Sequence, residues 1–351
     1  AWAPLVLQEE YDNCGLQNGD ADTEIDKALI TLDCSEAVVE EAVRNGCGLI
    51  VSHHPVIFGG LKSITGRSDV ERTILVAIRN NVASYAIHTN LDNVIDGVNG
   101  EIAARLGLSP LEVLDPKPGQ LLKLVVFVPR THADAVRDAL FAAGAGKLGG
   151  YDECSFNTEG LGTFRPGERT SPFVGKKGER HGEEEVRVEL LCRAIDQAAV
   201  LSAMRAAHPY EEVAYDLYPM VNSHPGIGSG LIGEWAAPME EGAFLGKLKD
   251  VFGAPAVRHS PFTGRPVRSV AVCGGSGAFL IGKAMAAGVD AYVTGDVKYH
   301  EFFKPDGRML LADIGHYNSE RFTMDLIQRR LGELLPTFAT RLTETVTNPI
   351  H

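Results

Sequence analysis

The first part of the chain alternates short apolar runs with amphipathic stretches, a pattern that predicts strands followed by helices. Residues 27–33 (KALITLD) predict a buried strand, and residues 35–46 (SEAVVEEAVRNG) predict a helix with a serine N-cap and a glycine at its end. Further strands are expected at CGLIVSHH and at 82–92, and further helices at 68–81 and in GVNGEIAARLGL. Strands that alternate with helices imply crossover connections, so we expect a mostly parallel sheet.

The pattern changes at LDPKPGQ (114–120), where two prolines and a glycine predict a linker. A strand (LLKLVVFVP) and a helix opened by Thr131 come next. The polar, glycine-rich tract at 156–185 is too long for a tight turn, so we expect a mobile loop there. A second strand, helix and strand run from EVRVELLCR to VAYDLYPM. This order predicts a small ferredoxin-like α+β module.

The α/β pattern returns near HPGIGSGLIGEW (224–235), with strands in VRSVAVCGGSG, DAYVTGDV and RMLLADIGH. A helix at 318–335 and a last edge strand in ATRLTETVTNP complete the chain. We therefore expect an α/β fold with one discontinuous core, built from two α/β halves, and an inserted ferredoxin-like module. The expected bounds are 1–115 for the first half, 116–223 for the module and 224–351 for the second half.

Length and charge narrow the classes of function. A chain of 351 residues is too long for one ordinary core. Its hydrophobic share of 44% and charged share of 23% are typical of a soluble globular protein. The net charge of −13 argues against a nucleic-acid groove, because phosphate contacts need clustered Lys and Arg. A small anionic substrate stays compatible with this charge, since a bound metal inverts the local potential.

Cysteine usage and hydropathy indicate the compartment. The six cysteines are scattered and form no CxxC pair, which favours a reducing compartment with buried thiols. No run of about 18 apolar residues appears, so no segment is expected to span a membrane. The opening stretch AWAPLVLQEE has no charged-then-apolar leader pattern. We expect a cytoplasmic protein without membrane contact.

Two adjacent histidines, His53 and His54, end the apolar run in LIVSHHPVIF. Neighbouring side chains on a strand point to opposite faces, so such a pair cannot share one target inside a strand. Here the strand ends, and Pro55 holds His54 extended, so the two rings can fan out around a ligand. The alternative interpretation is a pair of solvated histidines at a strand end.

Three further side chains, those of His316, Glu320 and Asp92, are candidate metal ligands. His316 and Glu320 lie four residues apart where DIGHYNSERF passes from strand to helix, which puts both on one side of the first turn. A helix start stabilised by an acidic side chain, next to a surface histidine, is the alternative. Asp92 follows a strand that carries His88 near its end, although an Asx residue in this place often only caps a turn.

These side chains share one position, at or just beyond the carboxyl ends of predicted parallel strands, where α/β sheets bind ligands. Three imidazoles and two carboxylates are more ligands than one catalytic zinc takes from a protein. The set therefore favours two divalent ions that share a carboxylate and keep positions open for water. Zinc, iron, manganese and cobalt all suit such donors. The candidate ligands are His53, His54, Asp92, His316 and Glu320.

The ordered motifs YDNCGLQNGD, SHHPVIFGGLKS, HTNLDNVIDGVN, AVCGGSG, TGDVKYHE, DIGHYNSE and TNPI resemble the NIF-three-like family, whose bacterial members are catalogued as GTP cyclohydrolase I type 2 homologs. The stretch ending in HPYEEVAYDLYPM resembles the CutA-like and P-two-like modules of longer bacterial members. The resemblance implies a dinuclear site. One metal would be held by His53 and Asp92, the other by His54 and His316, and Glu320 would bridge them.

The resemblance also implies an activity and an assembly. The expected reaction is attack of metal-activated water on C8 of the guanine ring of GTP, with opening of the ring and loss of formate. His88 and His300 are the candidate proton carriers, with a structural role as the alternative for each. Phosphoester hydrolysis is a related option. Cys14 departs from the family pattern, which has an apolar residue there; this bears on packing and not on ligands.

A second hypothesis of another class is a non-catalytic metal-binding ring scaffold or regulatory protein whose inserted module senses a ligand or partner. The resemblance implies a homo-oligomer for either hypothesis, a hexameric ring that encloses a cavity. Two glycine-rich stretches are not used by either hypothesis. CGGSG suits either a tight turn or a backbone approach to phosphate, but it lacks the Lys-Ser/Thr ending of a P-loop. GIGSGLIGE does not follow a clear strand, so we do not expect a dinucleotide fingerprint.

Overall fold

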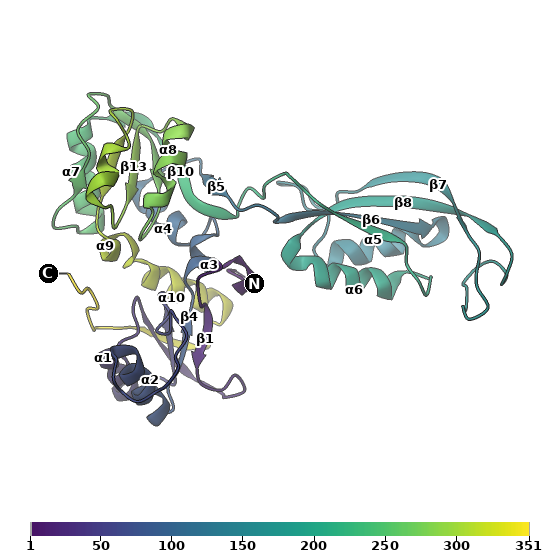
Figure 1. Ribbon diagram of the computed structural model, residues 1–351, viewed down its shortest axis with the longest axis horizontal. Helices are drawn as coiled ribbons and strands as arrows, with labels where there is room; N and C mark the ends of the chain where they lie inside the picture. The colour runs from purple at the N-terminus through teal and green to yellow at the C-terminus, as the bar shows by residue number, and fades with distance from the viewer. Residues whose placement is uncertain (1, 351) are drawn as a thin grey trace. The chain divides into compact units, whose positions relative to one another are not determined.

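The computed structural model describes residues 2–350 and divides into two compact units. The first unit combines the residues up to Pro116 with those from Pro225 onward, and the second unit is Lys117–His224. Both units mix helices and strands, which confirms the prediction of an α/β chain (Figure 1). No helix of the described residues is long and apolar enough to cross a membrane.

One sheet of the first unit has the strand order β1-β4-β3-β2-β15. Four of these strands run parallel, and β1 pairs antiparallel with β4 at one edge. The last strand of the chain, β15, lies at the other edge, as the sequence predicts. The strands are β1 (Gly15–Asn18), β2 (Lys27–Thr31), β3 (Leu49–Ser52), β4 (Ala83–Ala86) and β15 (Ala339–Leu342).

Helices cover both faces of this sheet (Figure 1). On one face, α1 (Glu36–Arg44) and α2 (Asp69–Arg79) pack together over Leu29 and Ile50. On the other face, α10 (Thr323–Leu334) contacts β2 and β15. Successive side chains of a strand point to opposite faces, so a continuously apolar strand such as β2 serves both layers.

The second sheet of this unit has the order β11-β14-β13-β12-β10-β5. Its strands β12, β13 and β14 are parallel, while β5, β10 and β11 pair antiparallel. The strands are β5 (Glu112–Pro116), β10 (Gly228–Met239), β11 (Arg258–His259), β12 (Val267–Val272), β13 (Ala291–Thr294) and β14 (Leu310–Asp313). Its helices include α7 (Glu241–Phe252) and α8 (Ile281–Ala287).

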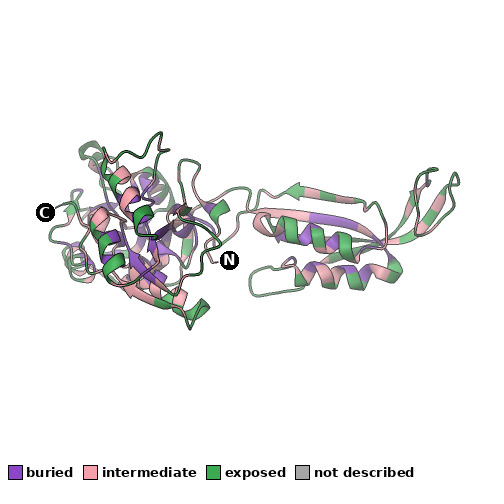
Figure 2. Cartoon of the chain, turned by 90° about the horizontal axis from the view of Figure 1, so that it is seen from below, coloured by how far each residue is buried: buried purple, intermediate pink, exposed green. Residues whose placement is uncertain are grey.

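A single apolar cluster connects the two sheets of the first unit. Helix α4 (Val98–Leu106) contacts β10, β12, α7 and α10, and its Val98 and Ile102 are almost fully buried. The cluster also contains Ile30 of the first sheet and Val270 of the second. In Figure 2 the buried residues concentrate in the strands and on the inward helix faces. The carboxyl ends of both sets of parallel strands therefore belong to one compact unit with a shared apolar core.

The second unit has the element order β6-α5-β7-β8-α6-β9, which is the ferredoxin-like order. Its antiparallel sheet has the order β7-β8-β6-β9, and both helices pack on the apolar cluster of Leu124, Val136, Val188 and Met204. The elements are β6 (Leu121–Pro129), α5 (Ala133–Ala142), β7 (Phe156–Phe164), β8 (His181–Arg193), α6 (Gln197–Ala207) and β9 (Tyr215–Pro219).

Three predictions for the region around this unit are wrong. The tract 156–185 is not one loop, because β7 and the start of β8 pair within it as a hairpin. The segment 114–120 is not wholly a linker, because β5 runs to Pro116 and pairs with β10. Thr131 does not cap a helix: it lies in a 3-10 turn, Arg130–His132, and α5 begins after it.

Two element boundaries of the first unit also differ from the prediction. The strand expected at 82–92 ends at Ala86, and a one-turn helix, α3 (Thr89–Asp92), follows it. The helix expected at 318–335 is two helices, α9 (His316–Glu320) and α10, so Asn318 and Ser319 lie inside α9 and do not cap it. Both differences fall at the candidate site, where short helical turns replace regular elements.

Candidate functional site

The five candidate ligands come together at the carboxyl ends of parallel strands from both sheets of the first unit. His53 and His54 follow β3 directly, and Asp92 ends α3 after β4. His316 and Glu320 begin and end α9, which follows β14. After β4 and β14 a short helix carries the candidate ligands, whereas after β3 the two histidines follow the strand end directly.

Glu320 lies at the centre of the cluster. Its Oε2 is 3.0 Å from Nε2 of His54 and 2.9 Å from Nε2 of His316, and these two nitrogens are 3.2 Å apart. Its Oε1 is 3.8 Å from Nε2 of His53, which in turn is 3.8 Å from Oδ1 of Asp92. The side chains thus form two groups that share Glu320, each compact enough to hold a metal ion.

The three histidines of the cluster and the neighbouring His88 are each held through the Nδ1 atom. His53 Nδ1 donates to the carbonyl of Ile87 at 2.8 Å, because a carbonyl oxygen only accepts. The Nδ1 atoms of the other three rings lie against carboxylates at 2.7–2.9 Å. These pairs are His54 with Asp33, His88 with Asp12, and His316 with Asp296. Metal-binding histidines are held in this manner, with one nitrogen anchored and the other free for the ion.

Two buried polar atoms in the cluster have no hydrogen-bond partner: Nε2 of His53 and Oδ1 of Asp92. Such an atom costs about 1–3 kcal/mol when it is left unsatisfied. Their separation is too long for a hydrogen bond, yet it is close to the roughly 3.3 Å between two ligands of a tetrahedral zinc at about 2.0–2.1 Å. The residues present therefore fit a bound metal on geometry and donor type.

Burial lowers the pKa of His53, so its ring is neutral and its Nε2 carries a lone pair. Burial also raises the pKa of the Asp92 carboxyl well above its usual range, and the charge of Glu320 adds to this. Burial alone would raise the pKa of Glu320, but hydrogen bonds with His316 and His54 outweigh it and hold that pKa well below its usual range. Burial and the mutual repulsion of Asp92 and Glu320 therefore disfavour a charge on both carboxylates unless positive charge lies beside them.

The two rings next to Glu320 behave differently. Burial lowers the pKa of His54, but its hydrogen bonds with Asp33 and Glu320 outweigh burial and raise that pKa to about 10. Hydrogen bonds with Glu320 and Asp296 likewise raise the pKa of His316 to about 9 against the effect of burial. In the metal-free chain, protons on these rings supply the positive charge that a divalent ion would bring.

Three carboxylates that anchor the rings are absent from the set found by sequence: Asp12, Asp33 and Asp296. Asp33 lies two residues beyond the end of β2 in the run TLD, and Asp296 lies two residues beyond the end of β13 in TGD. The rule that selected the other candidates, a polar residue at the carboxyl end of a parallel strand, selects these two as well. Asp12 follows no strand; it lies in the motif YDNCGLQNGD, which carries the family resemblance but assigned this residue no role.

The CGGSG stretch passes next to Glu320 as a tight turn. Gly275 has φ +60°, and a Cβ there would lie 2.3 Å from Oε1 of Glu320, so this position requires glycine. Three N–H groups of the turn already donate, those of Gly274, Gly275 and Gly277, to Asn99, Ser319 and Thr294 respectively. The tight-turn alternative is therefore the one that the structure supports. All but the first two residues of GIGSGLIGE lie in strand β10.

The two candidate proton carriers have different surroundings. The ring centroid of His88 lies 5.2 Å from that of His53 and 5.3 Å from that of His54, so His88 adjoins the cluster. His300 is exposed in a 3-10 turn, where its ring contacts are with Tyr299 and Phe303. Among the residues that the structure describes, His300 belongs to none of the ligand groups.

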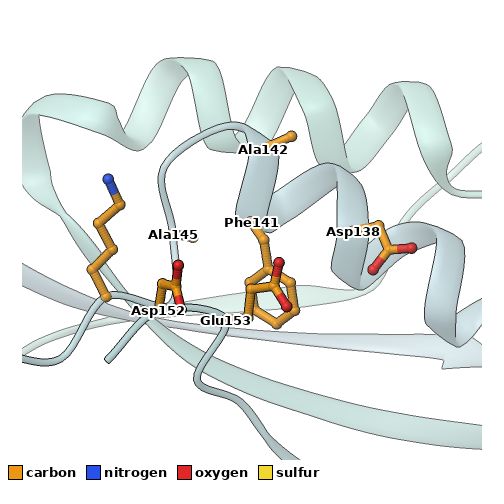
Figure 3. Close-up of a pocket in the computed structure, with 7 residues that line it drawn as sticks. Asp138, Phe141, Ala142, Ala145, Asp152 and Glu153 are labelled. Atoms are coloured by element: carbon orange, nitrogen blue, oxygen red, sulfur yellow. The ribbon is translucent and has the colours of Figure 1, made fainter. Parts of the chain in front are cut away.

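A separate pocket lies in the second unit (Figure 3). Its charged side chains are all exposed, so water screens them, and no buried unpaired atom of the described residues belongs to it. We assign no chemistry to this pocket. Its lining consists of Asp138, Phe141 and Ala142 of α5 and of Ala145, Lys147, Asp152 and Glu153 of the loop that follows.

Comparison with known proteins gives a consistent result along the whole chain. The family described as Duf34/NIF3 (NGG1p interacting factor 3) matches residues 1–349. A protein of Halalkalibacterium halodurans named GTP cyclohydrolase 1 type 2 homolog is 41% identical over 339 residues, covering 95% of this chain and 90% of the relative. A protein of the same name from Bacillus subtilis is 38% identical over 356 residues, covering 99% and 95%.

A solved structure agrees with the sequence relatives. The crystal structure of a Bacillus cereus protein related to NIF3 is 38% identical and superposes with a TM-score of 0.86, covering all of this chain and 95% of that one. Its similarity spans both units.

Proposed function

This chain belongs to the Duf34/NIF3 family, and on that premise we propose that it is a dinuclear metal-binding protein that acts as a metal-dependent hydrolase of a nucleotide-like substrate. The observation that carries the proposal is the pair of ligand groups that share Glu320. His53 and Asp92 complete one group, and His54 and His316 complete the other. A carboxylate common to two groups is the donor that a pair of neighbouring ions needs.

Divalent ions bound here would lower the pKa of coordinated water and stabilise negative charge that develops on the substrate. The chain's own residues supply the rest. The carbonyl of Ile87 and the carboxylates of Asp33 and Asp296 keep three rings in the orientation that leaves Nε2 for a ligand. His88, oriented by Asp12, lies next to this set and is the group that we propose to carry a proton.

The first reaction to assay follows from the relatives' name. In that reaction, one water attacks C8 of the guanine ring and opens the imidazole ring to a formamide, and a second water releases the carbon as formate. Hydrolysis of a phosphoester is a second candidate, since a metal pair supports both and the fold does not choose between them. The assembly that we propose is a homo-oligomeric ring of six chains in the cytoplasm.

The alternative function is a metal-binding scaffold or regulator without turnover. The observation that favours it is the second unit, which has a core and a sheet of its own and adds nothing to the described ligand groups. We propose that this unit is an inserted CutA-like or P-two-like module, which in this alternative senses a ligand or partner. A ligand response that depends on metal but yields no product would favour the scaffold.

The decisive measurement is metal content per chain by elemental analysis of protein purified without chelator. We expect about two ions in the wild-type chain and loss of metal in His53→Ala and Glu320→Ala. His259→Ala, which removes an exposed ring stacked on Phe262, is the matched control and keeps the wild-type content. No bound metal after dialysis against zinc, manganese and iron salts would refute the dinuclear site. A chain that binds metal but does not turn over nucleotides would favour the scaffold hypothesis over the hydrolase.

A further inference from the structure

Two exposed aromatic rings stand beside the ligand cluster and take no part in it. The centroids of Tyr11 and Phe58 lie 6.2 Å apart, and 65% and 52% of the two residues is accessible to water. Exposed aromatic side chains scattered singly need no explanation, but here two rings form one patch. Such a pair offers a flat apolar surface, which we call the aromatic platform.

The platform is continuous with the site. Phe58 meets the ring of His88 edge-on, with 6.1 Å between the centroids and 73° between the planes. His88 in turn adjoins the rings of His53 and His54. The phenol of Tyr11 lies near the same groups: burial raises its pKa, and the charges of nearby carboxylates, Asp92 among them, raise it further. Through His88, the platform is therefore joined by ring contacts to the histidines of the ligand cluster.

Hydrogen bonds hold the two halves of the platform together, although they come from different parts of the chain. Asn13 donates from Nδ2 to the carbonyl of Ile57 at 2.7 Å, and the N–H of Ile57 donates to Oε1 of Gln17 at 3.2 Å. Each bond joins the segment after Tyr11 to the residue before Phe58. The exposure of the rings is therefore a property of a fixed arrangement rather than of two unrelated loops.

We propose that Tyr11 and Phe58 bind the planar heteroaromatic ring of the substrate by stacking and so position it over the ligand cluster. This inference rests on the proposed function and names the part of the substrate that the chain recognises outside the metals. Stacking suits these residues because aromatic side chains and nucleobases both present π-faces. It also explains why apolar rings stay exposed at a site whose remaining groups are charged or polar.

The test compares ligands with and without the ring. Full-length protein, both metal-loaded and metal-free, is titrated calorimetrically with guanosine monophosphate, adenosine monophosphate and ribose 5-phosphate. We expect both nucleotides to bind more tightly than ribose 5-phosphate. In Phe58→Leu and Tyr11→Leu, nucleotide affinity falls by at least about fivefold, the low end of the loss per stacked base, while ribose 5-phosphate affinity stays constant.

Controls separate stacking from other effects. Tyr11→Phe keeps the ring and is expected to keep the affinity, and Phe156→Leu removes an exposed ring of the second unit without effect. Metal content, thermal unfolding and oligomeric state are measured for each variant. Equal losses for all three ligands, unchanged nucleotide affinity, no nucleotide binding by the wild type, or a change in assembly alone would overturn the proposal.

The same experiment distinguishes this inference from the proposed function. A wild-type chain that holds no metal but still prefers nucleotides to ribose 5-phosphate, with the preference lost in Phe58→Leu, retains the platform and refutes the dinuclear site. A chain that holds two ions and shows no preference for a ring refutes the platform alone.

Discussion

Each unit of this protein buries a histidine, and the two rings are satisfied in opposite ways. In the second unit, His208 donates from Nε2 to the carbonyl of Phe127 at 3.0 Å and accepts from the N–H of Tyr210 at 3.1 Å. In the first unit, His53 is fully buried and its Nδ1 has a partner, but its Nε2 has none. Burial lowers the pKa of both rings, so both are neutral.

The difference shows how to tell a structural histidine from a ligand. A ring whose two nitrogens both bond within the fold, like that of His208, contributes to stability and needs nothing else. A ring with one anchored nitrogen and one buried, unpaired nitrogen, like that of His53, lowers stability until a ligand arrives. Asp92 shows the same imbalance at its Oδ1. In the metal-free state, the unpaired atoms of His53 and Asp92 therefore lower the stability of the first unit, whereas His208 does not lower that of the second.

The largest effect is expected from metal removal. Each ion at 100 times its Kd stabilises the folded chain by about 2.7 kcal/mol, so stripping two ions with a chelator lowers the Tm by roughly 10 °C. In His53→Ala the chelator has far less effect, because the site is already lost. Calorimetric unfolding with and without chelator measures both. Equal shifts of the Tm in the wild type and in His53→Ala would contradict the assignment of His53 as a metal ligand.

The second effect is the pH dependence of metal uptake. In the metal-free chain the pKa of His54 is about 10 and that of His316 about 9, so both rings must lose a proton before they bind an ion. Below those values the apparent affinity falls with falling pH, by up to about tenfold per pH unit for each ring. Competition with a metal indicator between pH 6 and 8 tests the sign. An affinity that is flat or higher at pH 6 would contradict it.

The third effect concerns the carboxylates that orient the rings. Asp33→Ala leaves Nδ1 of His54 without its acceptor, and we expect metal affinity to fall by about 10- to 100-fold. Asp296→Ala acts in the same way on His316. Asp33→Asn keeps an acceptor and is expected to restore part of the metal affinity. Asp22→Ala, which removes an exposed aspartate between β1 and β2, serves as the control. Unchanged affinity in both alanine variants would show that the anchors are dispensable.

The smallest effect is expected in the second unit. His208→Ala leaves the carbonyl of Phe127 and the N–H of Tyr210 without their partner. We expect a loss of about 1 kcal/mol in the free energy of unfolding, because water reaches the half-buried Tyr210 and replaces part of the bonding. Denaturant unfolding measures the loss, and metal content stays at the wild-type value. A drop in metal content would contradict the assignment of His208 as a structural histidine.

Local pattern was enough for much of the fold. Ser35 and Ser68 accept from Val38 and Glu71 as N-caps, and the parallel strands β2, β3 and β4 lie where their apolar runs predict. The family resemblance carried by the ordered motifs is confirmed. The pattern failed at β7, whose side chains are almost all exposed. That strand exists through its backbone pairing with β8, and pairing leaves no hydrophobic periodicity in a sequence.

The candidate site also has features that local sequence predicts and features that depend on long-range contacts. The sequence by itself determined which chemical groups follow each strand, because a strand end and the residues after it are set by local order. It missed the helical turn at Thr89, since the carboxylate that accepts from its N–H is that of Asp12, 77 residues away. A contact over that distance in the chain has no local signature.

Only the tertiary structure decided that these strand ends meet. His54 and Glu320 are separated by 266 residues and lie 3.0 Å apart because the packing of α4 and α10 joins two sheets into one core. The same packing leaves Nε2 of His53 unpaired and brings Asp33 and Asp296 against their rings. Sequence order specifies the donors, whereas their distances come from long-range apolar contacts that cooperate across the whole unit.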